Sequence, residues 1–492
     1  MLRRSTIAGV IAVGSLAGCA VGPDFHAPAP PANTQYTRGQ QAPATSDAPG
    51  PGGVAQTFVA DRDIPADWYS LFQSSALDEL VRRSLRDSPT VEAAKAALKS
   101  AQDTYIAERG ALLLPQADGQ LGVTRERLPG AAFGNPAAPA STFTLYNAAV
   151  NVSYRLDVFG ASRRQVEELR AQADFQRWEL EAANLTLTGN VVTTAFDVAS
   201  LTDQLAAVQD VVAAETEEYK VVQRQFEVGA ASKSDVLSQQ AQLAQAQAVV
   251  PTLEKALAQA QHRLAVLAGK SPDDPDIPQF VLDHFTLPTE LPVSVPAKLV
   301  RQRPDVQAAE AQLHQATAAV GVATANLLPQ LNLTGSIGSE SVTADGLFGT
   351  GTGTWSLGAS LLQPLFHGGE LRYKRRAAVA DLERADAQYR QTVLAALEEV
   401  ADTLRALESD ARELRAQSEA EQAAANAFDI SKKQFAVGGV SYVTVLNAQR
   451  LYLQARQSRV QAQAARYSDS AALFQALGGG WWNRKDQEVA RQ

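Results

Sequence analysis

Few residues of this chain could do chemistry, and the one in the clearest context is its single cysteine, Cys19. It follows the small residues that end segment 16–18, and an apolar run over 7–17 begins shortly after Arg3 and Arg4. A charged start, a short apolar stretch and small residues before a cleavage point are typical of a secretory leader. The apolar stretch is shorter than the roughly 18 residues of a transmembrane helix. A cysteine thiol at the new N-terminus could act as a nucleophile and carry a thioether-linked lipid.

The string Leu-Ala-Gly-Cys over 16–19 resembles the lipobox of bacterial lipoproteins, whose cysteine is acylated and becomes the mature N-terminus. That resemblance implies a signal peptide over 1–18 and a lipid anchor, with palmitate among its acyl chains, on Cys19. The alternative is a secretory leader with a chance cysteine. Ala20 stands where lipoproteins retained in the inner membrane carry Asp, so the resemblance implies the outer membrane. Such acyl chains anchor a protein to one leaflet and do not span it.

The other candidates for chemistry do not form a recognisable active site. The five histidines are scattered, and none has metal-ligand spacing to another histidine or to a carboxylate pair. Residues 269–271 (Gly-Lys-Ser) look like the end of a phosphate-binding loop, but Leu264 stands where its first glycine is required. The glycine-rich run 349–353 does not fit the dinucleotide-binding pattern. The sequence therefore predicts no enzyme, no metal and no cofactor.

Composition narrows the class of protein further. The net charge of −9 argues against a nucleic-acid partner. One cysteine allows no internal disulfide, so stability must come from packing. Beyond the leader no segment approaches the apolar length of a transmembrane helix, so a spanning form would have to be a barrel. Residues 19–66 are rich in Pro, Ala and Gly, and we expect them to form an extended, lipidated tether.

An internal duplication organises the rest of the chain. Segment 89–101 matches segment 304–316 with seven identities, and segment 224–240 matches 433–449 with eight. The offsets are 215 and 209 residues, so the repeated unit is a domain of roughly 210 residues. The expected organisation is a signal peptide (1–18), the tether (19–66), repeat 1 (67–270), a linker (271–296), repeat 2 (297–478) and a C-terminal tail (479–492).

Each copy ends in a long helical hairpin. Segment 370–437 contains neither Gly nor Pro, and the matching segment 161–228 contains only Gly189. Both are rich in good helix formers, and at ~1.5 Å per residue each helix would extend on the order of 100 Å. No globular core is that long, so the helices are expected to join a coiled-coil-like assembly. The alternative, a free-standing coiled-coil rod, does not account for the leader or for the strands.

Each copy also carries two stretches in which apolar and polar residues alternate, as in strands with one apolar face. The apolar positions that we assign to a lipid-facing surface are Tyr146, Val150, Val152, Tyr154, Trp355, Leu357 and Leu361. Alternation alone does not distinguish a soluble sandwich from a membrane barrel with a polar lumen. Four strands cannot close a barrel, for which about eight are needed, so closure requires several copies. Two copies would give eight strands and a filled lumen, and three would give twelve and an open channel.

Several motifs occur in order on this duplicated frame, at 67–81, 155–160, 302–310, 327–338, 361–372, 437–453 and 476–482. Together they resemble the TolC-like outer membrane factors, in particular the NodT-type lipoproteins of resistance-nodulation-division (RND) efflux systems. The resemblance implies a mixed membrane α/β fold. In it, a homotrimer forms one twelve-stranded outer-membrane barrel, with four strands per chain, continuous with a long periplasmic helical tunnel. It also implies a passive exit duct for drugs or toxic small molecules in a Gram-negative bacterium. A periplasmic adaptor would connect the duct to an inner-membrane RND pump.

Two other functions stay open on the sequence alone. The same fold could serve as the outer-membrane channel of a type I, ABC-driven secretion system. The second open function is that of a periplasmic scaffold or adaptor without a pore. An adaptor would carry one helical hairpin, however, and this chain carries two.

The resemblance assigns a periplasmic, adaptor-docking tip to the two helix turns. The residues concerned are Val228, Gly229 and Ser232 in the first copy and Val437, Gly438, Gly439 and Ser441 in the second. Relatives often carry an acidic ring just after the second turn, whereas the matching residues here are Thr444 and Asn447. Asp235 is a third gate candidate, although a solvated position on the helix face is its simpler interpretation.

Overall fold

The computed structural model describes residues 20–33, 35–38 and 42–484. The leader 1–18, Cys19 and residues 485–492 lie outside the described residues, so the lipid anchor stays a prediction. The chain forms two compact units, each built from both halves of the sequence. Unit 1 comprises Met1–Pro28, Ala97–Gln176 and Ala308–Tyr389, and unit 2 comprises Ala29–Ala96, Arg177–Gln307 and Arg390–Gln492. Within the described ranges, every helix is too short or too polar to cross a membrane.

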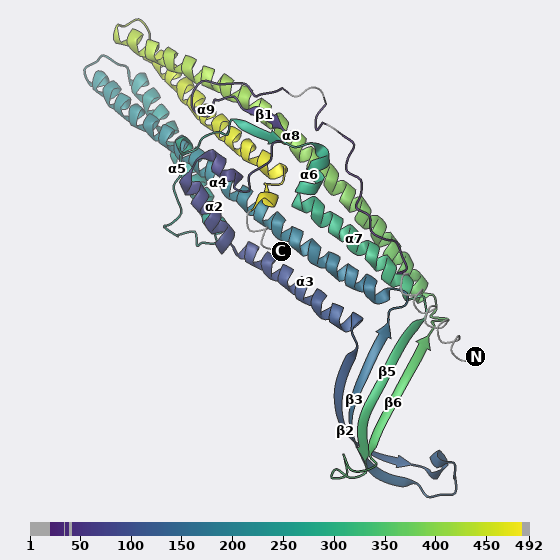
Figure 1. Ribbon diagram of the computed structural model, residues 1–492. Coiled ribbons are helices and arrows are strands. Elements are labelled where there is room, and N and C mark those ends of the chain that lie inside the picture. The colour runs from purple at the N-terminus through teal and green to yellow at the C-terminus, as the bar shows by residue number, and fades with distance from the viewer. Residues whose placement is uncertain (1–19, 34, 39–41, 485–492) are drawn as a thin grey trace. The chain divides into compact units, whose positions relative to one another are not determined.

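Unit 1 contains a four-stranded antiparallel sheet in the order β2-β3-β5-β6 (Figure 1). Its strands are β2 (Gln116–Leu128), β3 (Ser141–Leu156), β5 (Gln330–Ser341) and β6 (Gly353–Leu362). Each repeat supplies one hairpin, and β3 and β5 join the two hairpins in the middle of the sheet. The four strands predicted from alternation are confirmed.

The long helices also follow the prediction. α4 (Ala161–Glu227) and α8 (Glu370–Ala436) each contain 67 residues and end one residue before the predicted limit. Their hairpin partners, α5 (Lys233–Leu267) and α9 (Tyr442–Ala476), each contain 35. The equal lengths reflect the duplication, because equivalent glycines end both long helices.

The remaining helices precede the strands or cover unit 2. α3 (Pro89–Leu113) and α7 (Pro304–Ala325) are equivalent helices that directly precede the strands of each repeat, and each begins at a proline. Proline suits the first turn of a helix because that turn leaves backbone N–H groups unpaired. α2 (Ser75–Asp87) and α6 (Pro296–Gln302) are shorter and belong to unit 2.

An aromatic cluster forms the core of unit 2. Phe196, on α4, is completely buried, and its ring centroid lies 4.9 Å from that of Phe72 and 4.9 Å from that of Phe285. The ring centroid of Tyr467, on α9, lies 5.5 Å from that of Phe196. Tilted and edge-to-face rings at such distances stabilise by ~0.5–1.5 kcal/mol per pair beyond the area that they bury. The cluster therefore packs the start of repeat 1 (Phe72) and the linker (Phe285) against α4 and α9.

Two further strands correct the predicted count of four. β1 (Thr57–Ala60) lies in the tether and β4 (Glu290–Val293) in the linker, and they pair in parallel. Each strand has only four residues, which is too short for alternation to be recognised. The two strands also lie more than 200 residues apart in the sequence.

Candidate functional site

The two helix turns have the same backbone geometry. Gly229 (φ +76°) and Gly438 (φ +75°) are both left-handed, a conformation that residues with a Cβ resist. Gly229 donates its N–H to the carbonyl of Phe226 (3.0 Å), and Gly438 donates to that of Phe435 (2.9 Å). Each glycine thus ends a long helix and reverses the chain within a few residues.

Each turn exposes a valine in front of its glycine. Val228 is 80% exposed and Val437 is 83% exposed, and they occupy equivalent positions in the two repeats. The two exposed valines are therefore a matched feature of the two equivalent turns.

The helices that follow the turns begin with different caps. Ser232 and Asp235 form a reciprocal capping box: the Asp235 carboxylate accepts from the Ser232 N–H (2.8 Å) and hydroxyl (2.7 Å). These hydrogen bonds lower the pKa of Asp235. At the second turn the Ser441 and Thr444 hydroxyls lie 3.1 Å apart, and Asn447 is exposed one turn further along α9. Asp235 therefore has a structural partner, whereas Thr444 and Asn447 present neutral groups.

A polar contact connects the two hairpins close to their turns. The Tyr442 hydroxyl, at the start of α9, donates to Glu218 Oε2 of α4 (2.7 Å). Burial and this bond to a carboxylate raise the pKa of Tyr442, so its hydroxyl keeps its proton. On α5, Gln239 Nε2 donates to Glu215 Oε2 (2.5 Å), and burial raises the pKa of Glu215. Opening the hairpins at this end would break the bond between Tyr442 and Glu218.

The sheet brings all seven predicted apolar residues to one face. Val150 lies opposite Ile337, which lies opposite Trp355, and Val152, Gly335 and Leu357 form the next row. Residues directly opposite one another share a face. Trp355 is 80% exposed and Leu357 is 82% exposed, so the described residues leave this face uncovered along β6, whereas Ala148 of β3 is buried on it. Tyr146, Tyr154 and Leu361 lie on the same face by the same register.

The opposite face of the sheet is polar. Asn151, one residue from Val152, donates to Gln120 Oε1 across β2 and β3 (3.2 Å). The hydroxyls of Ser336 and Ser356 lie 2.8 Å apart across β5 and β6. Thus one face of the sheet is apolar and exposed, and the other carries polar side chains that bind one another.

Both outer strands of the sheet have an unpaired edge. β2 pairs only with β3, and β6 pairs only with β5, among the described strands. Exposed strand edges readily pair with another strand. The described sheet thus combines two free edges with one exposed apolar face.

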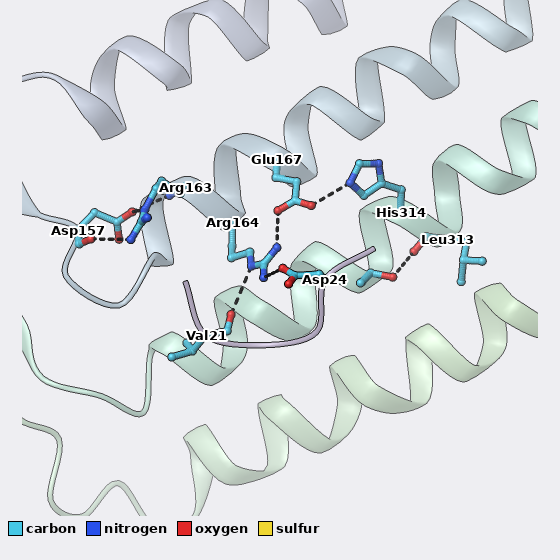
Figure 2. Close-up of polar contacts among 9 residues, drawn as sticks. Val21, Asp24, Asp157, Arg163, Arg164, Glu167, Leu313 and His314 are labelled. Atoms are coloured by element: carbon cyan, nitrogen blue, oxygen red, sulfur yellow. Dashed lines mark hydrogen bonds and ion pairs between the residues drawn. The ribbon is translucent and has the colours of Figure 1, made fainter. Parts of the chain in front are cut away.

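The N-terminal segment is held to unit 1 by a buried arginine that sequence reasoning missed. Figure 2 shows Arg164 between two carboxylates, with Nη2 2.5 Å from Asp24 and Nη1 2.8 Å from Glu167. Its Nε also donates to the carbonyl of Val21 (3.3 Å), and only 6% of the side chain is exposed. The hydrogen bond from Arg164 lowers the pKa of Asp24. Glu167 is also 2.9 Å from His314 Nε2, so the cluster extends from α4 to α7.

Ring stacking and close backbone contact complete this attachment. The rings of Phe25 and His314 stack with centroids 4.3 Å apart and an interplanar angle of 14°. A Cβ on Gly22 would lie only 2.5 Å from the Cα of Gly321, so the segment approaches α7 this closely because residue 22 is glycine. A Cβ on Gly321 would lie 2.8 Å from Cγ of Arg164, the residue that holds the segment. Segment 20–25, directly after Cys19, is therefore docked by specific contacts.

We expect Arg164→Met to release this segment without unfolding unit 1. The substitution removes three hydrogen bonds, two of them to carboxylates. Chymotrypsin should then cut after Phe25 roughly tenfold faster. The matched control is Arg163→Met, because Arg163 binds Asp157 (3.1 Å) and not the segment. The measurement is mass spectrometry of the released peptide, and equal cleavage of the two variants would contradict the docking role.

Comparisons with known proteins agree with this architecture. The sequence profile of the outer membrane efflux protein family matches residues 80–270 and 295–479. Solvent efflux pump outer membrane protein SrpC of Pseudomonas putida is 30% identical over 472 residues, which cover 95% of this chain and 96% of that protein. Pyoverdine export outer membrane protein OpmQ of Pseudomonas aeruginosa is 30% identical over 432 residues, which cover 86% of this chain and 89% of that protein. The solved outer-membrane channel OprN matches with a TM-score of 0.84 and 26% identity, over 94% of this chain and 100% of that one.

Proposed function

The chain belongs to the outer membrane efflux protein family and lies in the outer membrane of a Gram-negative bacterium, and from this premise we propose its assembly and partners. Three copies form a duct, with one shared barrel in the membrane and a helical tunnel in the periplasm. The acylated Cys19 adds an anchor in the membrane. An adaptor and an inner-membrane RND pump supply substrate at the periplasmic end, and the duct conducts it passively.

The observation that carries the proposal is the four-stranded sheet with two free edges, an exposed apolar face and a polar face. An open sheet edge is not tolerated in lipid, so the sheet must close. Three copies supply twelve strands when β6 of one copy pairs with β2 of the next. The apolar face, which includes Val152 and Trp355, then contacts lipid, and the face that includes Asn151 lines the lumen.

The helix turns are suited to the partner at the other end. Val228 and Val437 would supply the apolar part of an adaptor-docking surface, and Gly229 and Gly438 fix the backbone that presents them. The gate would be formed by Thr444 and Asn447. Because Asp235 is engaged by Ser232, this gate would lack an acidic ring, and we expect it to bind cations weakly.

The relatives suggest the class of substrate. SrpC belongs to a solvent efflux pump, and OpmQ exports pyoverdine. Similar chains thus serve small organic compounds of very different polarity. We propose that this chain also passes small organic molecules, with the choice of compound made by the pump.

The oligomeric state tests the assembly directly. Native mass spectrometry of the full-length protein, extracted in detergent, should give a complex of three copies. Three is the smallest number whose strands leave an open lumen. A monomer or a dimer as the largest species would contradict the duct.

A further inference from the structure

The segment that joins β6 to α8 exposes two adjacent large apolar side chains. Leu365 is 91% exposed and Phe366 is 87% exposed, the highest values for large apolar residues in the described part of the chain. Gly368 and Gly369, both left-handed at φ +59° and +89°, then turn the chain into α8. The described residues of the chain therefore cover little of either side chain.

Four exposed basic residues follow within the first two turns of α8, namely Arg372, Lys374, Arg375 and Arg376. With Glu370 as its one acidic residue, segment 370–376 has a net charge of +3, in a chain whose net charge is −9. Lys374 pairs with Glu370 (2.6 Å), whereas Arg372 and Arg376 have no carboxylate partner among the described residues. Cations near the N-terminus of a helix oppose its macrodipole, so helix stability does not explain this cluster.

The matching helix of the first repeat neutralises its arginines within the chain. At the start of α4, Arg163 pairs with Asp157 (3.1 Å). Arg164 pairs with two carboxylates, those of the N-terminal segment and of α4 itself. The start of α8 thus keeps positive charge available for an anion, and the start of α4 does not.

The docked N-terminal segment indicates the level of the membrane surface on unit 1. Val21 donates its N–H to the carbonyl of Phe159 (3.0 Å), just after β3 ends. A Cβ on Gly160 would lie 2.7 Å from the Cα of Ala20, so Ala20 is held against the start of α4. Ala20 directly follows Cys19, which we propose to be acylated. Acyl chains there would enter the membrane close to the junction of β3 and α4.

The register of the sheet carries this level across to β6. Leu156, at the end of β3, pairs with Leu331, and Leu331 pairs with Leu361 near the end of β6. β3 and β6 lead into α4 and α8 at the same end of the sheet (Figure 1). The exposed apolar pair and the basic cluster therefore follow the sheet at the level of the proposed lipid anchor.

We propose that residues 365–376, the junction segment, bind anionic phospholipids of the periplasmic leaflet of the outer membrane. This inference rests on the proposed lipid-anchored duct. Leu365 and Phe366 insert between acyl chains, and Arg372 and Arg376 bind headgroup phosphates. Guanidinium groups form charge-assisted hydrogen bonds with phosphate oxygens, and basic residues at a membrane surface favour anionic over zwitterionic lipids.

Photo-cross-linking in cells identifies what contacts Phe366. The full-length protein carries p-benzoylphenylalanine in place of Phe366, and mass spectrometry identifies the adducts formed on irradiation. We expect phospholipid adducts at this position. The matched control is the same replacement of Val437, which is 83% exposed but lies at the turn between α8 and α9, and it should give none. Adducts of residue 366 with a second copy of the chain, and not with lipid, would overturn the proposal.

Native mass spectrometry of the full-length protein in detergent tests the headgroup preference. Protein stripped of lipid is titrated with phosphatidylglycerol or with phosphatidylcholine that has the same acyl chains. Arg372→Gln combined with Arg376→Gln should lower the affinity for phosphatidylglycerol roughly tenfold and leave that for phosphatidylcholine unchanged. The matched control is Arg412→Gln combined with Arg415→Gln, two exposed arginines further along α8, and it should bind as the wild type does. Equal affinity for phosphatidylglycerol in the wild type and the first variant would count against the proposal.

The same spectra separate this inference from the proposed function. Wild-type trimers that bind both lipids equally would overturn the lipid site and leave the duct intact. Wild-type protein without trimers would instead contradict the duct. If the variant at residues 372 and 376 fails to fold, the cross-links at position 366 decide, because that protein keeps all four basic residues.

Discussion

Val152→Arg is expected to reduce the yield of assembled protein in the outer membrane severely, whereas Asn151→Arg leaves it near the wild-type level. The two residues are adjacent on β3 and face opposite sides of the sheet. Val152 lies in the middle of the exposed apolar face, in the row with Gly335 and Leu357. An arginine facing lipid near the midplane of the bilayer costs ~2–4 kcal/mol.

The control residue differs only in the face that it occupies. Asn151→Arg loses the hydrogen bond to Gln120, but its new charge would enter a polar lumen. The measurement is the amount of the heat-labile oligomer in outer-membrane fractions of cells that make equal amounts of protein. Equal yields of the two variants would contradict the assignment of the faces.

Gly438→Pro is expected to abolish export while membrane insertion is preserved. Gly438 has a φ of +75°, and proline is restricted to about −65°, so the turn between α8 and α9 cannot keep its geometry. The turn exposes Val437 and lies next to Ser441 and Thr444, the residues that we propose for docking and gating. Cells with this variant should be as sensitive to solvents and antibiotics as a deletion strain.

Gly438→Asn is the matched control for the turn. Asparagine adopts the left-handed conformation more readily than other residues with a Cβ, so resistance should be largely retained. Outer-membrane levels of both variants are measured in parallel. Full resistance in the proline variant would contradict a role of this turn in export.

The elements that repeat a pattern over many residues could be predicted from the sequence. The helices α4 and α8 follow from runs of 68 residues without proline and with at most one glycine. That glycine, Gly189, has a structural reason. A Cβ at this position would lie 2.3 Å from Gln475 Oε1, because α4 and α9 pack closely there. The sheet and its two faces follow from alternation alone.

Single contacts between distant segments could not be predicted. Arg164 and Asp24 are 140 residues apart, and Gln56 and Ser470 are 414 apart, with no periodic signal at either end. One contact at the helix turns does have a local signal. Ser232 and Asp235 have the spacing of a capping box, which predicts a structural partner for the carboxylate rather than a free gate charge.

The most direct test of the central claim, an exit duct served by an adaptor and an RND pump, is cross-linking in living cells. The tagged protein is captured after cross-linking, and the attached proteins are identified by mass spectrometry. We predict recovery of a periplasmic adaptor together with an inner-membrane RND pump, and we expect Gly438→Pro to reduce the yield of both. Recovery of an ABC transporter in place of that pump would contradict the proposed system, and recovery of neither partner would contradict the duct.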